Sequence, residues 1–424
     1  MPEPITIIVA GAGSRGATYA EYARAFPEKC RVVGVAEPRE VLRERFAADH
    51  NVPRENVFSD WRDMAARDRF ADAAIVATQD AMHEEPAIAF ANLKYDVLLE
   101  KPMATTEQSC RNIVRAVRDN GIIFSVCHVL RYVAATRKIK EIIADGAIGD
   151  VVTIQRMEPV GYWHYAHSYV RGNWRSEAIG SPMLLAKACH DTDWIRYIMD
   201  APCTRVSSFG ALRHFRRENH PAGASDRCLD CGVEQTCPYS AVRFYMAAFD
   251  RGDTDWPLSI ITPIITRENV LEALRNGPYG RCVYTSDNDV VDNQVVIMEF
   301  EGGRHASFEM GAFSKVGPRR TIIGGTRGEI ISETAAGMTL YDYLNDQTRE
   351  IMVSDDVPIE MSGHGGGDYG VIDTFIQGVA TRDQSRILTG PMETLETHLM
   401  VFAAERSRHK GTVEPVLLDL QPPV

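Results

Sequence analysis

Ile5-Thr6-Ile7-Ile8-Val9-Ala10 runs directly into Gly11-Ala12-Gly13-Ser14-Arg15-Gly16, and this junction decides the fold of the first part of the chain. The apolar run predicts a buried strand, and the stretch 15–25 predicts a helix behind the glycines. Gly11 permits a tight turn, Gly13 lets a pyrophosphate approach the backbone, and Gly16 lets helix and strand pack together. The free N–H groups of the first helical turn then face the phosphates. The junction therefore predicts a dinucleotide-binding turn.

A carboxylate stands at the end of the next apolar run, at Glu37, 21 residues after Gly16. At this place an acidic side chain accepts hydrogen bonds from a ribose diol and repels a 2′-phosphate. Arg39 lies two residues further on and is of a type that tolerates such a phosphate, so NADP stays open. The glycines and Glu37 predict an NAD site, with Ser14 and Arg15 in the phosphate-binding turn.

Short apolar runs alternate with amphipathic stretches up to about residue 126. The expected further strands are 31–36, 73–77, 96–99 and 122–126, and the expected further helices are 39–49, 83–92 and 105–119. Strand and helix in alternation predict a parallel sheet with right-handed crossovers. We therefore expect an α/β chain whose residues 1–126 form a Rossmann domain.

The bulk composition bounds the rest of the chain. At 424 residues it is too long for one hydrophobic core, so we expect a second domain over 127–424. The formal net charge of −12 argues against nucleic acid or a membrane surface as a partner. No apolar run approaches the roughly 18 residues of a membrane helix. The N-terminus lacks a secretion signal, and most of the nine cysteines stand singly, which favours the reducing cytoplasm.

Polar residues follow the third and the fourth expected strands of the first domain. The third strand ends in Ala77-Thr78-Gln79-Asp80, with His83 following, and the fourth ends in Leu99-Glu100-Lys101-Pro102. An E-K-P after the fourth strand, together with the glycine turn and Glu37, resembles the glucose–fructose oxidoreductase / inositol dehydrogenase / MocA (Gfo/Idh/MocA) family. The resemblance covers nearly the whole chain apart from an insertion at about 213–285. It continues through Trp174-Arg175, the stretches 184–194 and 322–330, and a closing helix at about 391–409.

The resemblance implies a Rossmann domain followed by an α+β domain with a large, open, mainly antiparallel sheet. In the family the other face of that sheet often makes oligomers, which implies a homo-dimer or homo-tetramer. A carbohydrate substrate is implied to meet the nicotinamide between the domains. The residues agree, because Glu301-Gly302-Gly303 suits a hairpin turn between β-rich stretches. These stretches are 150–158, 204–210, 294–300, 304–313 and 319–324.

Hydride transfer from a secondary alcohol needs a base for the hydroxyl proton and a carbon atom held beside the nicotinamide. In the family the E-K-P lysine contacts the substrate hydroxyl and the cofactor, and this catalytic role is carried over to Lys101. A surface lysine before a turn-forming proline is the plainer alternative. Further cofactor contacts are assigned to Thr78, His83, Glu100, Trp174 and Arg175.

The stretch 184–194 predicts a buried helix on which Lys187, His190 and Asp191 share one face. Such groups are costly to bury without a purpose. The family carries D-x-x-x-H here; His190 matches the histidine, whereas Ala186 replaces the aspartate. We therefore expect catalytic roles for His190 and for Lys187, the latter as a base of lowered pKa. The alternatives are a core histidine at 190 and, for Lys187, binding of a substrate carboxylate, sulfonate or hydroxyl.

Substrate contacts are expected from residues that face the cleft. The candidates are His128, Arg131, Trp163, His164, Asp191 and His364. The aromatic run 161–169 is typical of a loop that stacks on sugar rings, although it would equally suit a packed loop. Near His364 a glycine-rich turn precedes a helix, for which Asp368 is a suitable N-cap.

The insertion carries Cys228-x2-Cys231-x5-Cys237, a spacing at which the thiolates of one loop suit tetrahedral zinc. Cys282 is the expected fourth ligand, and His214 and His220 are the alternatives. A closed site of four ligands would be structural, holding together an insertion too small for its own core. An iron–sulfur cluster and free thiols are the alternatives.

The expected function is NAD-dependent transfer of a hydride between the nicotinamide and a secondary hydroxyl of a sugar, cyclitol or glycoside. The alternative is an NAD-dependent glycoside hydrolase, which oxidises C3 transiently, eliminates the aglycone, adds water and reduces the ring again. A non-catalytic NAD sensor is a third hypothesis, and the ionisable residues of 184–194 argue against it.

Overall fold

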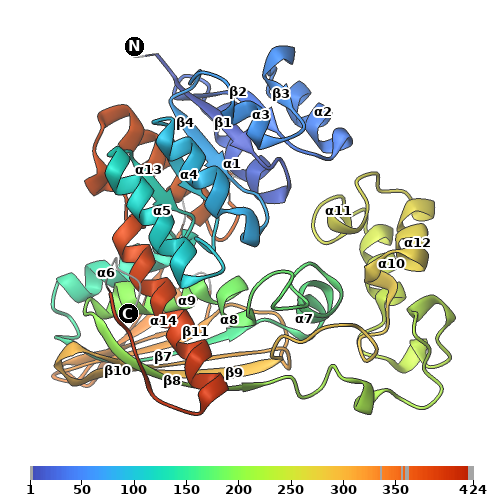
Figure 1. Cartoon of the computed structure of the whole chain (residues 1–424). Coiled ribbons are helices and arrows are strands. Elements are labelled where there is room, and N and C mark those ends of the chain that lie inside the picture. Colours follow the sequence, from blue (N-terminus) through green and yellow to red (C-terminus); the bar gives the residue numbers. More distant parts are fainter. Residues whose placement is uncertain (1–2, 335–336, 355–356, 359–361, 419–424) are drawn as a thin grey trace.

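The computed structural model describes residues 3–334, 337–354, 357–358 and 362–418. Its first part is a six-stranded sheet in the order β3-β2-β1-β4-β5-β6, in which every neighbouring pair is parallel (Figure 1). The strands are β1 Ile5–Ala10, β2 Cys30–Ala36, β3 Val57–Phe58, β4 Ala73–Val76, β5 Asp96–Leu99 and β6 Phe124–Val126. The helices are α1 Ser14–Ala25, α2 Glu40–Asp49, α3 Trp61–Ala65, α4 Glu84–Asn92 and α5 Glu107–Asn120. The predicted Rossmann fold is confirmed.

The strand order reverses between β1 and β4, where open α/β sheets bind ligands. Five of the six strands were predicted within two residues of their bounds, because they are mainly apolar runs that are largely buried on both faces. The sequence analysis missed β3 and α3, which are too short to show a hydrophobic period.

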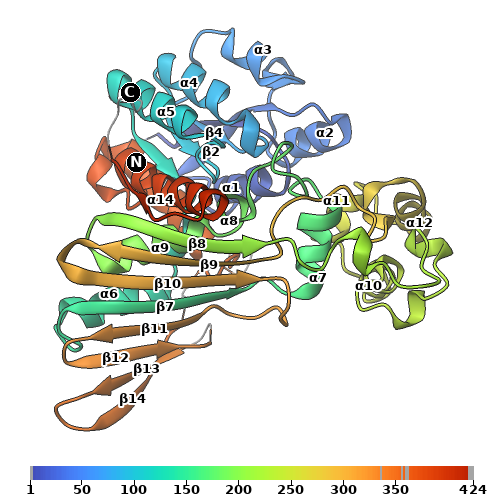
Figure 2. The same ribbon diagram turned by 60° about the horizontal axis from the view of Figure 1, so that its bottom comes forward.

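A second sheet has nine strands in the order β14-β13-β12-β11-β7-β10-β9-β8-β15, and Figure 2 shows it lying beneath the Rossmann sheet. Only β7 and β10 pair in parallel, so the sheet is mainly antiparallel, as expected. The strands are β7 Val151–Pro159, β8 Cys203–Ala211, β9 Asn293–Phe300, β10 Arg304–Gly311, β11 Arg320–Gly325, β12 Gly328–Ser332, β13 Gly337–Asp342, β14 Gln347–Met352 and β15 Glu414–Pro415.

Two late helices join the sheets. The helix α13, Gly367–Thr381, packs on α1, and its Val371 and Phe375 share one hydrophobic core with Ile7 and Val9 of β1. The helix α14, Pro391–Lys410, runs between the domains and packs on both β8 and α5 (Figure 1). The second half of the chain therefore builds part of the core beneath the Rossmann sheet.

Two expectations about helices are wrong. The stretch 184–194 is not one helix: α8, Met183–Ala186, ends before Lys187, and α9, Cys189–Met199, begins two residues later. Asp368 is not an N-cap, since α13 begins at Gly367 behind Gly366 in the left-handed region. Asp368 instead lies in the first turn and binds Arg15.

The insertion holds a small core of its own, contrary to expectation. Its helices are α10 Ala241–Asp250, α11 Leu258–Ile261 and α12 Arg267–Asn276. Tyr245, Leu258 and Leu274 are among the eight residues of this separate cluster. Its cysteine-bearing part has only single turns of 3₁₀ helix. The insertion projects from one end of the second sheet, next to α7, Tyr162–Tyr165 (Figure 2).

No helix in the described part of the chain has the length and apolar character needed to cross a membrane.

Candidate active site

The glycine turn has the geometry that its sequence predicts. Gly11 has a φ of 94°, and a Cβ atom there would lie 2.4 Å from the carbonyl oxygen of Ala77. A Cβ at Gly16 would lie 2.0 Å from the carbonyl oxygen of Gly11, so strand and helix approach as closely as glycine allows. At Gly13 such an atom would meet only the end of the Arg39 side chain, which leaves the backbone accessible. The start of α1 has no side-chain cap, so its N–H groups fit a pyrophosphate.

Glu37 is buried at the end of β2 and is paired with Arg39. Its carboxylate accepts hydrogen bonds from the backbone of Ala12 at 3.0 Å and from Arg39 Nε at 2.6 Å. Burial raises the pKa of Glu37, but the hydrogen bonds from Arg39 outweigh it and hold the pKa below its ordinary value. An ionised carboxylate is what a ribose diol requires. The Arg39 guanidinium lies directly beside the Glu37 carboxylate. Both side chains therefore stand where the adenosine end of a dinucleotide would bind in a Rossmann domain.

Arg15 connects the glycine turn to α13. Its guanidinium donates to Glu100 Oε1 at 2.7 Å and to Asp368 Oδ1 at 2.6 Å. Tyr19 also donates to Glu100, at 2.9 Å. His364 lies 3.0 Å from Asp368 through its Nδ1. This network fixes Glu100 beside Lys101 and holds the loop of His364 against the cofactor domain.

Lys101 crosses from the Rossmann domain to the second domain. Its Nζ donates a hydrogen bond of 2.7 Å to the carbonyl oxygen of Ala186. His83, predicted to contact the cofactor, is buried between the carbonyl oxygens of Pro102, at 2.7 Å, and Thr78, at 3.2 Å. It therefore joins the ends of β4 and β5. The hydroxyl of Thr78 is buried without a partner in the described residues and is free for a ligand.

His190 lies in α9, just after the break that follows Ala186, and is almost fully buried. Its ring meets that of His128 edge to face at 5.6 Å, and the ring of His364 lies 6.4 Å away. Burial, followed by the charge of Lys101, lowers the pKa of His190 well below its ordinary value. The ring is therefore neutral at physiological pH. His128 is entirely enclosed between His190 and His398, so it reaches the cleft only through His190.

Lys187 and Asp191 belong to an ionic cluster with Arg156, Glu158 and Arg319. Lys187 Nζ lies 3.3 Å from Glu158, and Arg319 lies 2.9 Å from the same carboxylate. Asp191 has no exposed surface, and it accepts from Arg156 at 2.7 Å and from Arg319 at 2.6 Å. Three cations thus share two carboxylates. Asp191, expected to touch substrate, instead holds the two arginines in place.

Burial lowers the pKa of Lys187, while the charge of Glu158 acts in the opposite direction. Arg319 and Lys101 add to the lowering by repelling the charged form. The cluster therefore has more positive than negative charge.

The aromatic run lies beside these cations. Burial, then the charges of Lys187, His167 and Lys101, lower the pKa of His164 well below its ordinary value. Trp163 packs against Trp256 of the insertion, with ring centres 5.3 Å apart. Both tryptophans line a cavity of about 740 Å³ between α7 and α10. The aromatic run therefore meets Lys187 and Lys101 on one side and a cavity on the other.

The predicted Trp174-Arg175 pair divides between two partners. Trp174 Nε1 donates to Asp80 Oδ2 at 2.9 Å, which ties the second domain to the loop after β4. Arg175 donates to Asp287 at 2.9 Å. Arg131, expected to contact substrate, is buried in a bidentate pair with Asp193 at 2.7 and 2.8 Å. Its charge is satisfied inside the second domain.

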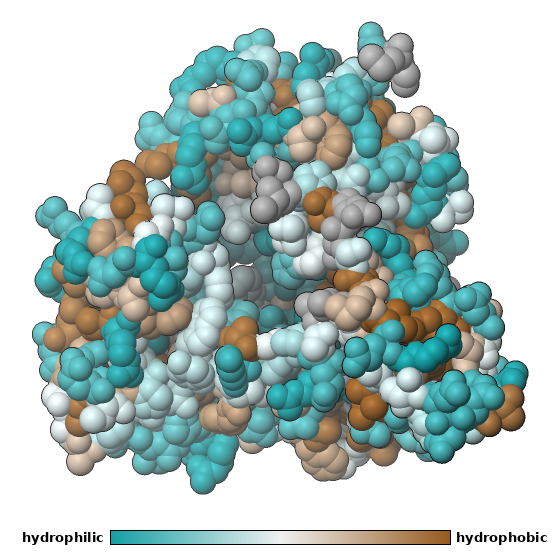
Figure 3. Space-filling view, turned by 180° about the vertical axis from the view of Figure 1, so that it is seen from behind, coloured by the Kyte–Doolittle hydropathy of each residue, from teal (hydrophilic) through white to brown (hydrophobic). Residues whose placement is uncertain are grey.

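Figure 3 shows the molecule hollowed between its upper part, the Rossmann domain, and the second sheet below. The structure thus brings together Lys101, Lys187, His164, His190 and His364.

The sequence analysis missed Glu158 and Arg319. Arg156 and Glu158 share a buried strand face with apolar Ile154. Two charges at alternate positions of that face were the signal that could have found them.

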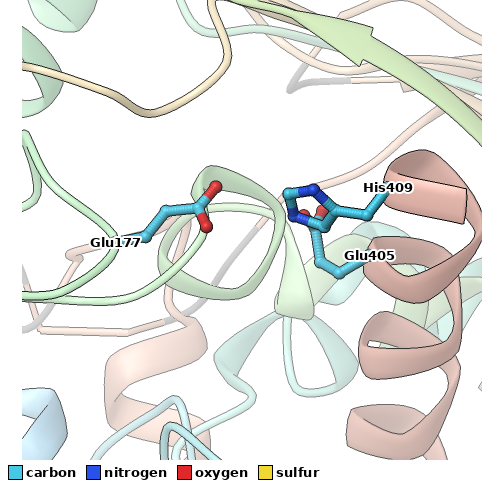
Figure 4. A group of neighbouring side chains, drawn as sticks. All are labelled: Glu177, Glu405 and His409. Atoms are coloured by element: carbon cyan, nitrogen blue, oxygen red, sulfur yellow. The ribbon is translucent and has the colours of Figure 1, made fainter.

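A second cluster of ionisable side chains lies at the C-terminal end of α14. Glu177 points toward Glu405 and His409 in Figure 4, with ligand atoms within 4.8 Å of one another. Arg408, however, donates to Glu177 at 2.9 Å and to Glu405 at 2.6 Å. Both carboxylates therefore already accept from one arginine, so we interpret the three residues as part of an ion-pair network.

Comparisons with known proteins cover almost the whole chain. Residues 5–128 match the family model described as oxidoreductase family, NAD-binding Rossmann fold, and residues 140–418 match that of the oxidoreductase family C-terminal alpha/beta domain. These are the N- and C-terminal models of the Gfo/Idh/MocA family.

Among curated proteins, YteT of Bacillus subtilis, named as an oxidoreductase, is 24% identical over 376 residues, 84% of this chain and 83% of its own. The 2,7-anhydro-N-acetylneuraminate hydratase of Mediterraneibacter gnavus is 28% identical over 193 residues, 43% of this chain and 46% of its own. Among solved structures, a levoglucosan dehydrogenase in complex with NADH and L-sorbose has a TM-score of 0.72 at 18% identity. That match covers 98% of this chain and 100% of the other.

Proposed function

The chain belongs to the Gfo/Idh/MocA oxidoreductase family, and we propose that it oxidises a secondary hydroxyl of a sugar, cyclitol or glycoside with NAD. The observation that carries the proposal is the hydrogen bond from Lys101 to Ala186, the last residue of α8, shortly before His190 in α9. It joins the end of β5 to α8 and sets a lysine beside a neutral histidine at the domain boundary. NAD supplies the hydride acceptor when it is bound. The side chains orient the substrate and accept its hydroxyl proton.

Lys101 orients the substrate. A lysine has three donor hydrogens, and the carbonyl oxygen of Ala186 uses one of them. The remaining donors hold the hydroxyl oxygen of the substrate and stabilise the negative charge that grows there as the proton leaves. Because Ala186 replaces the aspartate of the family pattern, the partner of Lys101 is a neutral carbonyl. The positive charge of Lys101 is therefore not offset by this partner and can act on the substrate.

His190 is the proposed proton acceptor. Its Nδ1 is enclosed without a hydrogen-bond partner among the described residues, so the ring meets the substrate through Nε2. The lowered pKa keeps the ring neutral and able to take the hydroxyl proton. Lys187 is the proposed binder of substrate oxygens, because Glu158 at 3.3 Å favours its charged form. This reading selects one of the two roles that the sequence left open.

The remaining site assignments follow from position. Glu37 and the glycine turn bind the dinucleotide, with Ser14, Arg15 and Thr78 nearby. His164, Trp163 and His364 line the sugar side. His128, Arg131 and Asp191 act as positioning residues, since their side chains are enclosed in the second domain.

The alternative function is redox-assisted cleavage or hydration of a glycoside. It is favoured by a second nitrogen base beside the proposed hydride site, since burial, followed by the charges of Lys187 and Lys101, lowers the pKa of His164 and keeps its ring neutral. A ring oxidised at one carbon has an acidic neighbouring C–H, and elimination needs a base for that proton. One relative is named a 2,7-anhydro-N-acetylneuraminate hydratase.

One assay separates the two functions. The protein is incubated with NAD and a panel of sugars, cyclitols and aryl glycosides, and both NADH absorbance and aglycone release are followed. Accumulating NADH supports net oxidation, whereas aglycone release without net NADH supports the alternative. Tight NAD binding with neither signal would reject both and favour a sensor.

Self-association and location are further parts of the proposal. Phe209, 68% exposed, and Ile297, 45% exposed, lie on one face of the second sheet, because Phe209 pairs with Val295 and Ile297 is two residues along. We assign this face to a homo-oligomer. The nine cysteines are free and several are fully buried, which suits the cytoplasm. A structural zinc in the insertion completes the proposed cofactors.

A further inference from the structure

Four cysteines from two distant segments line one small cavity. They are Cys228, Cys231, Cys237 and Cys282. The cavity has a volume of about 20 Å³, and Tyr239 and Tyr284 help to enclose it. Cys228 and Cys282 are buried, while Cys231 and Cys237 are partly exposed. The insertion therefore gathers four of the nine thiols of the chain around one enclosed point.

Backbone pairing sets Cys282 beside the first three cysteines. Cys282 N donates to the carbonyl oxygen of Asp226 at 2.8 Å, and Arg227 and Arg281 form an antiparallel bridge. The thiol of Cys228 then lies 3.9 Å from the carbonyl oxygen of Arg281. These contacts do not depend on a metal ion, so the fold itself holds the two segments together.

The two histidine candidates for a fourth ligand lie elsewhere. His214 Nε2 is hydrogen-bonded to the hydroxyl of Tyr284 at 3.2 Å, with its ring against Phe215 and Tyr239. Neither His214 nor His220 lines the cavity. The geometry therefore favours Cys282, the fourth ligand expected from the sequence, over the two histidines.

We propose that Cys228, Cys231, Cys237 and Cys282 bind one zinc ion as four thiolates, in a closed structural site. Each thiol gives its proton to solvent when its sulfur binds, and no group is oxidised or reduced. In a tetrahedral site each sulfur lies about 2.3 Å from zinc. In the structure no three of the four sulfurs lie within 4.8 Å of one another, so binding rotates the side chains inward.

The size and charge of the site favour a single divalent cation. A volume of about 20 Å³ holds roughly one water-sized sphere, whereas four irons and four sulfides need far more. The four sulfurs would bind as thiolates, whose negative charge a divalent cation offsets.

Arg171 connects the metal site to the substrate side. Its Nη2 lies 3.6 Å from Cys228 Sγ and donates to the carbonyl oxygen of Tyr239 at 2.8 Å. Its Nε donates to the carbonyl oxygen of Arg281 at 2.7 Å. A guanidinium at this place offsets the negative charge of four thiolates around zinc. Arg171 also ends the π-helical turn, Ala166–Arg171, that follows α7 with Trp163 and His164. The metal therefore fixes the insertion against the aromatic run.

The test is the metal content of the full chain. Wild type, Cys282→Ser and Cys203→Ser are produced with zinc in the medium and examined by native mass spectrometry. We expect one zinc per chain in wild type and in Cys203→Ser, whose cysteine lies in β8, and none in Cys282→Ser. NAD titration checks that each variant is folded. Cobalt substitution provides a second readout, because a tetrahedral thiolate site gives intense visible absorption with Co²⁺.

Three outcomes would overturn the proposal: wild type without zinc, zinc retained by Cys282→Ser, or iron and sulfide in stoichiometric amount. A wild-type mass lowered by the hydrogens that are lost when a disulfide forms would also overturn the proposal. None of these measurements needs a substrate, so a failed carbohydrate assay leaves them unaffected. A chelator is further expected to lower the thermal midpoint of wild type and leave that of Cys282→Ser unchanged.

Discussion

Lys101 donates its side-chain hydrogen bond to the carbonyl oxygen of Ala186, 2.7 Å away, and to no carboxylate among the described residues. A cation held by a neutral carbonyl keeps its charge for the substrate. We expect Lys101→Ala to lower kcat by about 10²–10⁴-fold, the usual range for loss of a group that handles a proton or developing charge. The affinity for NAD, measured by fluorescence titration, changes little.

Lys94→Ala is the matched control, because Lys94 lies on the same domain and only donates to the backbone of Asn120. Unchanged kcat in Lys101→Ala would remove Lys101 from the mechanism.

The charge of Glu158 is expected to set the alkaline limb of the activity profile. Burial lowers the pKa of Lys187 and Glu158 opposes this, so Glu158→Gln lowers the pKa further. If Lys187 binds substrate as a cation, kcat/KM falls at a lower pH in the variant than in wild type. Glu309→Gln, exposed on β10, leaves the profile in place. A gain of activity at lower pH would instead identify Lys187 as a base.

Replacement of Glu37 is expected to relax coenzyme choice. In Glu37→Ser the ribose diol loses its acceptor and Arg39 loses its partner at 2.6 Å. We expect NAD to bind about tenfold more weakly, equivalent to roughly 1.4 kcal/mol, and NADP to bind more tightly through the freed guanidinium. Dissociation constants for both coenzymes measure the effect. If Glu37→Ser still rejected NADP, Arg39 would have no part in selection.

The Rossmann half was predictable because its signals are local. A strand buried on both faces, such as Ile5–Ala10, reads as a continuous apolar run, and Gly11 and Gly16 are required by contacts within the same turn. The break between α8 and α9 has no such signal. Lys187 and Ala188 are residues that helices accept, and the break arises where Lys187 reaches Glu158 of a distant strand.

The site was predicted as a set of residue types, and tertiary pairing then changed several of their roles. Asp191 and Arg131 are ionisable residues near the cleft, but each is enclosed by a partner that one sequence cannot reveal, Arg319 and Asp193 respectively. The backbone contact of Cys282 with Asp226 and the bridge between Arg227 and Arg281 set Cys282 beside the other cysteines, and no local sequence signal predicts these contacts.

The buried His398 is expected to make the fold sensitive to acid. It has no exposed surface; its Nδ1 donates to the carbonyl oxygen of Thr394, and its Nε2 accepts from the backbone N–H of Met103. Burial lowers its pKa to about 3. Below pH 6.5 His398 is protonated in the unfolded chain but stays neutral in the folded chain. The free energy of unfolding therefore falls as the pH is lowered from 6.5 toward 3. Each pH unit costs about 1.4 kcal/mol, so His398→Gln should lose about 2 kcal/mol less than wild type between pH 6.5 and 5. Urea unfolding at several pH values measures this slope, with exposed His305→Gln as control; equal slopes in wild type and His398→Gln would show that His398 is protonated in the folded protein.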